Sequence, residues 1–346
     1  MPYRDSGKQL LGMDRKGVSA MIVAGVDGGG SKTLAVIADE TGRVLGSGRS
    51  GCANHQIAGV EQAVAHMDEA LQEALQASGL SRKRLDFVQY GLAGADRPHD
   101  FAVLTPALAG RLAGVPFGIV CDVYEGLRLA SPQQVGVVLV CGSNTNAAGR
   151  NRAGETATAS GFGTLFGDRA GGYYLADQAF ARTIRSWDGR EPETLLTARI
   201  PRALGFGGMA EMVDHYLDHD LAAAPLELAR VVHDAADDGD WLSLALLREM
   251  GEELGLSAST VMRKLGGFGE MEELPLVLTG SILQAGRHPV LLEALLSRAR
   301  AGHPGLKPVI PTLAPVFGAV LMAMDRMDIA TAACTLHHFE SYAEGM

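Results

Sequence analysis

Cysteine is scarce in this sequence, with four residues among 346, and no two of them form a Cys-x-x-Cys pair. Such scattered cysteines predict neither a disulfide framework nor a structural zinc site, and they fit the reducing environment of the cytoplasm. Positive charge is also in deficit, because 30 Lys and Arg stand against 40 Asp and Glu, a formal net charge of −10. Nucleic-acid phosphates would be repelled, so we expect no nucleic-acid partner.

Long apolar runs are missing too. No stretch approaches the ~20 consecutive apolar residues that span a membrane, and Met1 to Gly17 is polar, unlike a signal peptide. We therefore expect no membrane partner and treat residues 1–20 as an N-terminal extension. What the chain has instead is length, 47% hydrophobic residues and 44 glycines. This composition predicts a globular protein of two domains with many turns.

Two stretches of the sequence share one order of strand, turn and strand. In the first, residues 21–27 (MIVAGVD) predict a buried strand, a GGGS turn follows, and residues 33–38 predict a second strand. In the other, residues 135–141 (VGVVLVC) precede a GSNT turn and a strand that begins at Asn146. Repetition at this separation predicts a duplicated domain, with one polar hairpin turn from each copy facing a shared ligand cleft.

The rest of the chain alternates between helical and extended patterns. Apolar residues at i, i+3 and i+4 spacing predict the main helices, at residues 60–77, 172–184, 223–236, 241–264 and 290–299. Short apolar runs predict strands at residues 87–91, 117–121 and 276–279. This alternation predicts an α/β fold with a mixed sheet in each domain. We expect domains at 21–131 and 132–325, with a final helix at 326–346 that is free to join the first.

The glycine-rich turn after the first strand carries the strongest chemical signal. Glycines at 28–30 let backbone N–H groups approach an anion closely, and the hydroxyls of Ser31 and Thr33 add donors. Asp27, at the end of the strand, is a candidate for holding Mg²⁺ through water. A Walker A loop does not fit because Ser31 separates Gly30 from the lysine, and a dinucleotide fingerprint does not fit because a strand follows.

Asp122 directly follows the apolar run at residues 116–121 (PFGIVC). A carboxylate there projects from the carboxyl end of the sheet, where ligands of α/β proteins usually bind. Phosphoryl transfer needs positioning, charge neutralisation and one group that accepts a proton, a role that a carboxylate can fill. Asp122 also precedes a short helical stretch and could serve as its N-cap. The sequence leaves both uses open.

Several segments resemble, in their order and spacing, the N-acetylglucosamine kinase and BadF/BadG/BcrA/BcrD-type ATPase family of the sugar kinase–Hsp70–actin superfamily. They are Asp27 to Thr33, Gly51 to His55, Gly91 to Asp96, the strand end at Asp122, Val138 to Asn146, Gly161 to Asp168, Leu278 to Ser281 and Pro311 to Ala319. The resemblance covers the chain from about Met21 to Ala323. It implies two duplicated actin-like (ribonuclease H-like) ATPase domains with a ligand cleft between them.

The resemblance also implies a role for each matching residue. Asp122 matches the catalytic base. Positions that match the ATP phosphate loops are Gly28, Gly29, Gly30, Ser31, Lys32, Thr33, Gly142, Ser143, Asn144 and Thr145, and those that match the adenosine turn are Thr279, Gly280 and Ser281. Positions on the sugar side are Asn54, His55, Asp96, Asn146, Gly161, Phe162, Gly163 and Asp168. ATP and Mg²⁺ are the implied cofactors.

Three departures from the family pattern affect the cleft. Asn144 stands where the second phosphate turn usually has glycine, and asparagine tolerates left-handed backbone better than most residues. The segment Gly167 to Gly171 reads GDRAG instead of the usual GDEGS, and Phe162 replaces a common tryptophan. Two of the three changes fall on the sugar side, so the identity of the acceptor is the least constrained inference.

These observations predict an ATP-dependent kinase that phosphorylates N-acetylglucosamine, or a related amino sugar, at the 6-hydroxyl. One alternative is an ATPase that activates an electron-transfer enzyme through a shared iron–sulfur cluster, which requires exposed cysteines at a dimer interface. Another is a sugar or nucleotide sensor without turnover, suggested by Asn144. The expected partner is a small-molecule sugar, and the resemblance is compatible with a homodimer.

Overall fold

The computed structural model describes residues 20–269, 271–286 and 288–344. Within them the chain divides into two compact units. Unit 1 runs to Gln134 and resumes at Pro311, and unit 2 spans Val135–Ile310. The expected boundary at residue 325 is therefore wrong, because the helix after Pro311 packs in unit 1. No helix in the described part of the chain is both long and apolar enough to cross a membrane.

Unit 1 is built on a mixed five-stranded sheet with the order β3-β2-β1-β4-β5. Its strands are β1 (Ile22–Gly28), β2 (Thr33–Asp39), β3 (Val44–Ser50), β4 (Phe87–Leu92) and β5 (Phe117–Cys121). The first three strands pair antiparallel as two hairpins, whereas β4 and β5 run parallel to β1. The carboxyl ends of β1, β4 and β5 therefore meet at one edge of the sheet.

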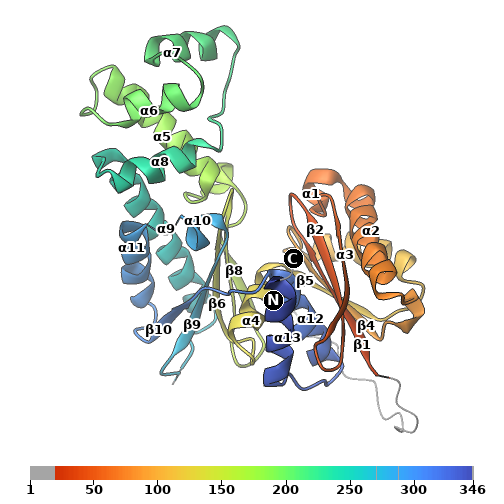
Figure 1. Ribbon diagram of the computed structural model, residues 1–346. Helices are drawn as coiled ribbons and strands as arrows, with labels where there is room; N and C mark the ends of the chain where they lie inside the picture. Colours follow the sequence, from red (N-terminus) through yellow and green to blue (C-terminus); the bar gives the residue numbers. More distant parts are fainter. Residues whose placement is uncertain (1–19, 270, 287, 345–346) are drawn as a thin grey trace. The chain divides into compact units, whose positions relative to one another are not determined.

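Helices cover both faces of this sheet (Figure 1). On one face lie α1 (His55–Ala58), α2 (Val60–Ser78), the 3₁₀ turn Arg82–Arg84 and α3 (Pro98–Leu112). On the other lie α4 (Val123–Ala130), α12 (Pro315–Arg326) and α13 (Ala333–Glu344). Strand periodicity explains this layering, because Ala24 and Val26 point into the first core and Val23 into the second.

Gly25 explains why α12 belongs to unit 1. A Cβ atom at Gly25 would lie 2.5 Å from the backbone nitrogen of Val320, so β1 and α12 approach too closely for any side chain at this position. The buried residues of α12, among them Phe317 and Met324, complete the second core of unit 1. Nearly 300 residues of sequence separate the two contacting segments, so local patterns gave no sign of this contact.

Unit 2 repeats the sheet of unit 1. Its order, β10-β9-β6-β7-β8, is the order of unit 1 read from the other edge. The strands are β6 (Gly136–Cys141), β7 (Thr145–Arg150), β8 (Thr156–Ala159), β9 (Leu274–Thr279) and β10 (Leu306–Val309). Again the first three pair antiparallel and the last two run parallel to the first. Shared order and direction confirm the predicted α/β fold with a mixed sheet in each half.

A helical layer packs on the sheet of unit 2 and forms its main hydrophobic core. Its helices are α5 (Gly172–Trp187), α6 (Leu196–Ala203), α7 (Met209–Asp218), α8 (Leu228–Asp237), α9 (Trp241–Lys264), α10 (Ser281–Gln284) and α11 (Pro289–Arg300), with a 3₁₀ turn at Thr164–Phe166. The helix expected from residue 223 begins only at Leu228, because Pro225 disfavours helical backbone just before it. Helices α6 and α7 extend beyond α5 and α8 (Figure 1).

Candidate functional site

A cluster of carboxyl groups lies at the carboxyl edge of the unit 1 sheet. Asp27 is near the end of β1, level with Gly91 on β4, and Asp122 directly follows β5. Asp96 comes from the loop after β4, and Glu125 from the first turn of α4. The parallel register of β1, β4 and β5 thus gathers acidic side chains that sequence positions spread over about a hundred residues.

Asp122 occupies the N-cap position of α4 without capping it. Its φ and ψ of −53° and −28° are already helical, whereas a capping residue usually has extended backbone, and its side chain makes no capping hydrogen bond. The carboxylate instead accepts a hydrogen bond of 3.3 Å from the Cys121 thiol. Burial, together with the negative charge of Asp96, raises the pKa of Asp122 to about 6 against the opposing effect of the thiol. Of the two uses left open by the sequence, the capping hydrogen bond is not made, although the backbone N–H groups of Val123 and Asp122 also lower the pKa of the carboxylate.

Glu125 was not found by sequence reasoning. Its side chain is fully buried, and no hydrogen-bond donor among the described residues reaches either carboxyl oxygen. Its polar neighbour is the carboxyl group of Asp27, so a hydrogen bond between the two needs a proton on one of them. Burial, followed by the charges of Asp27 and Asp122, raises the pKa of Glu125 well above its usual value. Burial and Asp122 likewise raise the pKa of Asp27 to about 7.

Two glycines make room for Glu125. A Cβ atom at Gly91 would overlap the carboxyl group of Glu125, and one at Gly318 would overlap its backbone carbonyl. A local signal existed, since Glu125 lies three residues after Asp122 and on the same helical face. The cavity that accepts it, however, is formed by residues from β4 and α12.

Replacing Glu125 by methionine should stabilise the protein. The change removes a buried carboxyl group without a partner at similar volume, and we expect about 1–3 kcal/mol of added unfolding free energy. The gain should be larger at pH 8 than at pH 5. Because the pKa of Glu125 is raised in the folded state, the wild-type protein loses stability as pH rises above the pKa of the unfolded chain, and the variant does not.

Urea unfolding of both proteins at the two pH values measures this effect. Glu125→Gln is the matched control, because it keeps a buried polar group of the same shape that cannot ionise. It should remove the pH dependence without the full gain in stability. A methionine variant that is less stable than the wild type at pH 8 would show that the carboxyl group is favourably bound.

The glycine-rich turn of unit 1 forms the expected hairpin between β1 and β2. Gly29 donates its backbone N–H to the carbonyl of Lys32, at 3.0 Å, and Ser31 and Lys32 are exposed. Gly28 lies against Leu92, where a Cβ would come within 2.7 Å of that side chain. Thr33 differs from expectation: its side chain is buried and its hydroxyl donates to the carbonyl of Gly51 at 2.7 Å. Its hydroxyl is therefore a structural group in this structure.

The second turn, between β6 and β7, is braced on the start of α5. Gly142 accepts a hydrogen bond from the backbone of Gly172, and Ser143 accepts one from Tyr173. Ser143 and Asn144 are exposed at its tip. Asn144 does not have positive φ, so its substitution for glycine causes no strain of this kind. Thr145, like Thr33, is buried and donates its hydroxyl within the sheet, to Val140 at 3.1 Å.

The expected adenosine turn lies beside this second turn in unit 2. Gly280 has a φ of +89°, and a Cβ atom there would come within 2.5 Å of the backbone of Cys141. A Cβ atom at Gly142 would be 3.7 Å from the backbone nitrogen of Ser281. The hydroxyl of Thr279 donates to the carbonyl of Leu139 at 3.3 Å, which leaves Ser281 as the exposed hydroxyl of the turn.

Asp168 organises a glycine-rich loop on the same unit. One of its carboxylate oxygens, Oδ2, accepts the backbone N–H groups of Gly161, Phe162 and Gly163, at 3.0, 2.7 and 2.6 Å. Its other oxygen, Oδ1, makes no hydrogen bond in the described structure. Phe162 is 56% exposed, so it does not fill the core. The loop passes directly over Asn146, because a Cβ at Gly161 would lie 2.8 Å from that side chain, and Asn146 Oδ1 is buried without a described donor.

The remaining sugar-side candidates lie in unit 1. Asn54 caps α1, and its Oδ1 accepts the N–H of Gln56 at 2.9 Å, which leaves the amide nitrogen to contact a ligand. His55 is held at 3.2 Å by buried Asp100, and no partner for its Nδ1 is found in the described residues. Asp96 has one buried oxygen without a described partner. All three residues therefore keep a polar group that is not used by the fold.

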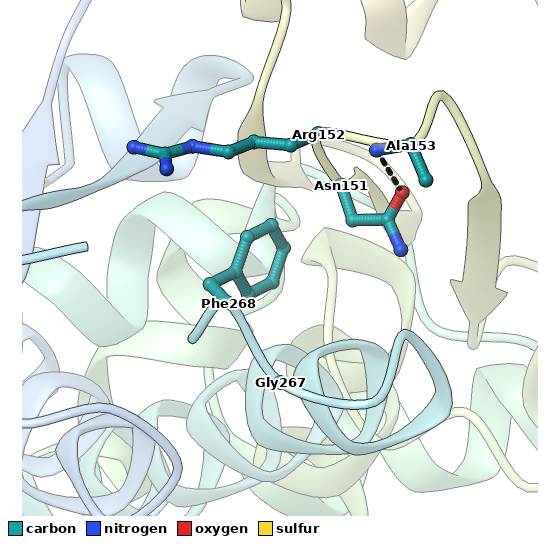
Figure 2. A pocket seen from close by; sticks show the side chains of 5 residues that line it. All are labelled: Asn151, Arg152, Ala153, Gly267 and Phe268. Carbon is teal, nitrogen blue, oxygen red and sulfur yellow. Dashed lines mark hydrogen bonds between the residues drawn. The ribbon is translucent and has the colours of Figure 1, made fainter. Parts of the chain in front are cut away.

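A small cavity lies in unit 2, next to the end of β7. About 170 Å³ in volume, it is lined by Asn151, Arg152, Ala153, Gly267 and Phe268, at the end of β7 opposite Thr145 (Figure 2). Asn151 closes the turn by accepting the N–H of Ala153 at 3.0 Å, and the Arg152 side chain extends away from it. The cavity contains none of the candidate residues, and we assign it no part in the site.

The model of the BadF/BadG/BcrA/BcrD ATPase family matches residues 24–323. The chain belongs to this family. Two curated relatives are each 26% identical to it. One, the N-acetylmuramic acid/N-acetylglucosamine kinase of Clostridium acetobutylicum, aligns over 88% of this chain and 99% of its own length. The other, the N-acetyl-D-glucosamine kinase of Dictyostelium discoideum, aligns over 89% and 99%.

Solved structures agree with the family assignment. A Chromobacterium violaceum protein, described as a candidate N-acetylglucosamine kinase, superposes with a TM-score of 0.66 at 25% identity, over 88% of this chain and 99% of that one. A ROK family glucokinase of Streptomyces griseus, solved with glucose and AMPPNP, gives 0.54 at 17% identity over 88% and 98%. The second likeness concerns the fold alone. This protein therefore has the actin-like fold of sugar kinases.

Proposed function

We propose that this protein is an ATP-dependent kinase of N-acetylglucosamine, or of a related amino sugar, that phosphorylates the 6-hydroxyl. The observation that carries the proposal is the state of Asp122. Its carboxylate stands at the carboxyl end of a parallel strand, does not cap the following helix, and has a pKa of about 6. At neutral pH it is mostly ionised and ready to accept a proton, as a general base requires.

The chain's own groups account for the proton transfer. The acceptor O–H gives its proton to Asp122, the oxygen attacks the γ-phosphorus, and the bond from that phosphorus to the β-phosphate oxygen breaks to release ADP. A pKa near 6 suits this role, since the carboxylate is basic enough to take the proton and is still ionised at pH 7. Exposed Ser31, Lys32 and Ser143 supply donors for the phosphates.

The donor set suits magnesium held mainly by the nucleotide. Among the described residues no three acidic, histidine or cysteine side chains converge as a metal site. Partly exposed Asp27 offers one carboxylate at the edge of the glycine turn, and Mg²⁺ commonly uses one or two carboxylates with substrate phosphates and water. When bound, the ion neutralises charge on the transferred phosphoryl group. We propose that Asp27 holds it through water.

We propose that the sugar is bound by polar groups that make no hydrogen bond within the described structure. Asp168 Oδ1, the amide nitrogen of Asn54 and the side chain of Asn146 can hydrogen-bond sugar hydroxyls, and exposed Phe162 offers an apolar face to the ring. The iron–sulfur activator alternative gains no support, because Cys121 and Cys141 are buried, and exposed Cys334 belongs to no metal-binding group of the described residues. A homodimer and a cytoplasmic location stay predictions from the sequence.

A screen of acceptors in a coupled ADP assay tests the function. Candidate sugars are N-acetylglucosamine, glucosamine, N-acetylmannosamine, N-acetylmuramic acid and glucose, and the product is identified by mass and by the position of its phosphate. We expect ADP release that depends on the sugar and is fastest with N-acetylglucosamine or a close relative. ADP release that is equal with and without every sugar would indicate an ATPase, and no ADP release with bound ATP would indicate a sensor.

A further inference from the structure

Cys121 lies in direct contact with the proposed base. It is the last residue of β5 and is 4% exposed, and its Sγ is 3.3 Å from Asp122 Oδ1, with the thiol as donor. The parallel pairing of Cys121 with Leu92 fixes the strand backbone and hence the place of the sulfur. No other side chain in the described structure has a hydrogen bond to the Asp122 carboxylate.

The backbone of Asp122 makes this thiol important. Because Asp122 already has helical φ and ψ, its carboxylate makes no capping hydrogen bond to α4, and the backbone N–H groups near it are those of Val123 and of Asp122 itself. Without the thiol, only these two backbone N–H groups would oppose the acidic side chains near the carboxylate. Asp96 faces it from the loop after β4, Asp27 from β1 and Glu125 from α4.

We propose that Cys121 is a positioning residue, whose S–H donates to Asp122 and holds the carboxylate in the orientation in which it accepts the acceptor's proton. The inference rests on the proposed function through the role of Asp122. A thiol is a weak donor, but it stays protonated here. Burial, with the charges of Asp122 and Asp96 and a hydrogen bond to Asp96, raises the pKa of Cys121 well above its usual value. The donor therefore persists wherever the base is ionised.

Removing the donor should change the pH profile in a defined direction. Donation to the ionised carboxylate favours that form and lowers the pKa of Asp122, so Cys121→Ala should raise it. The acid limb of kcat/KM for the sugar should move to higher pH. Because one weak hydrogen bond is lost, we expect kcat near pH 6 to fall about threefold to tenfold and the loss to shrink by pH 8. The KM for ATP should not change.

The experiment compares full pH profiles of the wild type, Cys121→Ala and Cys121→Ser. Serine keeps a donor at the same place and should return the acid limb to the wild-type pH or below it. Cys141→Ala is the matched control, because Cys141 ends strand β6 of unit 2, is fully buried, and has no hydrogen bond from its sulfur to a carboxylate of the described residues. Its profile should keep the wild-type limb. If Cys121→Ala does not fold, the serine profile decides, since a stronger donor must move the limb to lower pH.

An alanine profile that superposes on the wild type overturns the proposal, as does an unchanged serine profile where only serine folds. Either result leaves the kinase and its base intact if Asp122→Asn is inactive. Full activity of Asp122→Asn instead removes the base, and the proposal about Cys121 with it. Absence of sugar-dependent ADP release in the wild type is a failure of the proposed function and is seen before any variant is made.

Discussion

Replacing Asp122 by asparagine should lower kcat by about 10²–10⁴-fold, the usual contribution of a general base. Asparagine keeps the shape of the side chain but accepts no proton. The hydroxyl oxygen of the sugar must then attack while its proton is still attached. ATP binding should persist, because the exposed groups of the two proposed phosphate turns, Ser31 and Ser143, are unchanged. Steady-state kinetics and calorimetric titration with ATP measure the two effects separately.

The pH dependence of kcat/KM in the wild type tests the ionisation of the same carboxylate. Only the ionised form of Asp122 accepts a proton, so kcat/KM should fall below pH 6, by about tenfold per pH unit, where protonated Asp122 predominates. Asp218→Asn, an exposed change on α7, is the matched control and should leave the profile and rate unaltered. More than a tenth of wild-type kcat in Asp122→Asn would show that another group accepts the proton.

The two hairpins could be predicted from sequence because each depends on neighbouring residues. Apolar runs define β1 and β6, and glycine-rich turns follow them directly. Comparing the two runs was enough to expect a duplication, which the matching strand orders confirm. Local sequence patterns could not assign α12 to unit 1, because the assignment depends on the close approach of Gly25 to Val320.

Residue type alone does not show whether a hydroxyl in these turns is available to a ligand. Thr33, Thr145 and Thr279 were expected to contact nucleotide, yet each hydroxyl donates to a backbone carbonyl in the structure. A threonine at the end of a strand can satisfy either a ligand or its own backbone, and only the local geometry decides. The nearby serines, Ser31, Ser143 and Ser281, are exposed.

The backbone conformation of Asp122 and the burial of Glu125 could not be predicted from sequence. The sequence left Asp122 as base or cap, and its φ and ψ, which reflect how α4 begins, separate the two uses. Glu125 went unnoticed because a glutamate in a short helix is normally exposed. Its burial depends on the absence of side chains at Gly91 and Gly318, residues far away in the sequence.

Replacing Asp168 by alanine should disable the acceptor side while leaving the nucleotide side intact. One carboxylate oxygen holds three consecutive N–H groups, and hydrogen bonds to a charged acceptor contribute about 1.5–3 kcal/mol each before exposed N–H groups regain water. We expect kcat/KM for the sugar to fall on the order of 100-fold, since a loop placed about 1 Å away costs that much. Asp168→Asn keeps an acceptor oxygen without the charge, so its kcat/KM for the sugar should lie between those of the wild type and Asp168→Ala.

Proteolysis can report the loop separately from activity. Phe162, Leu165 and Phe166 are 56%, 89% and 74% exposed, so chymotrypsin can reach them once the backbone is free to adapt. Cleavage within 161–167 should be markedly faster in Asp168→Ala than in the wild type. Asp177→Ala is the matched control, because Asp177 holds the N–H of Ala224 elsewhere in unit 2. Equal cleavage of all three proteins would mean that the Asp168 carboxylate does not order the loop, and a lower sugar affinity would then reflect direct contact with its free oxygen.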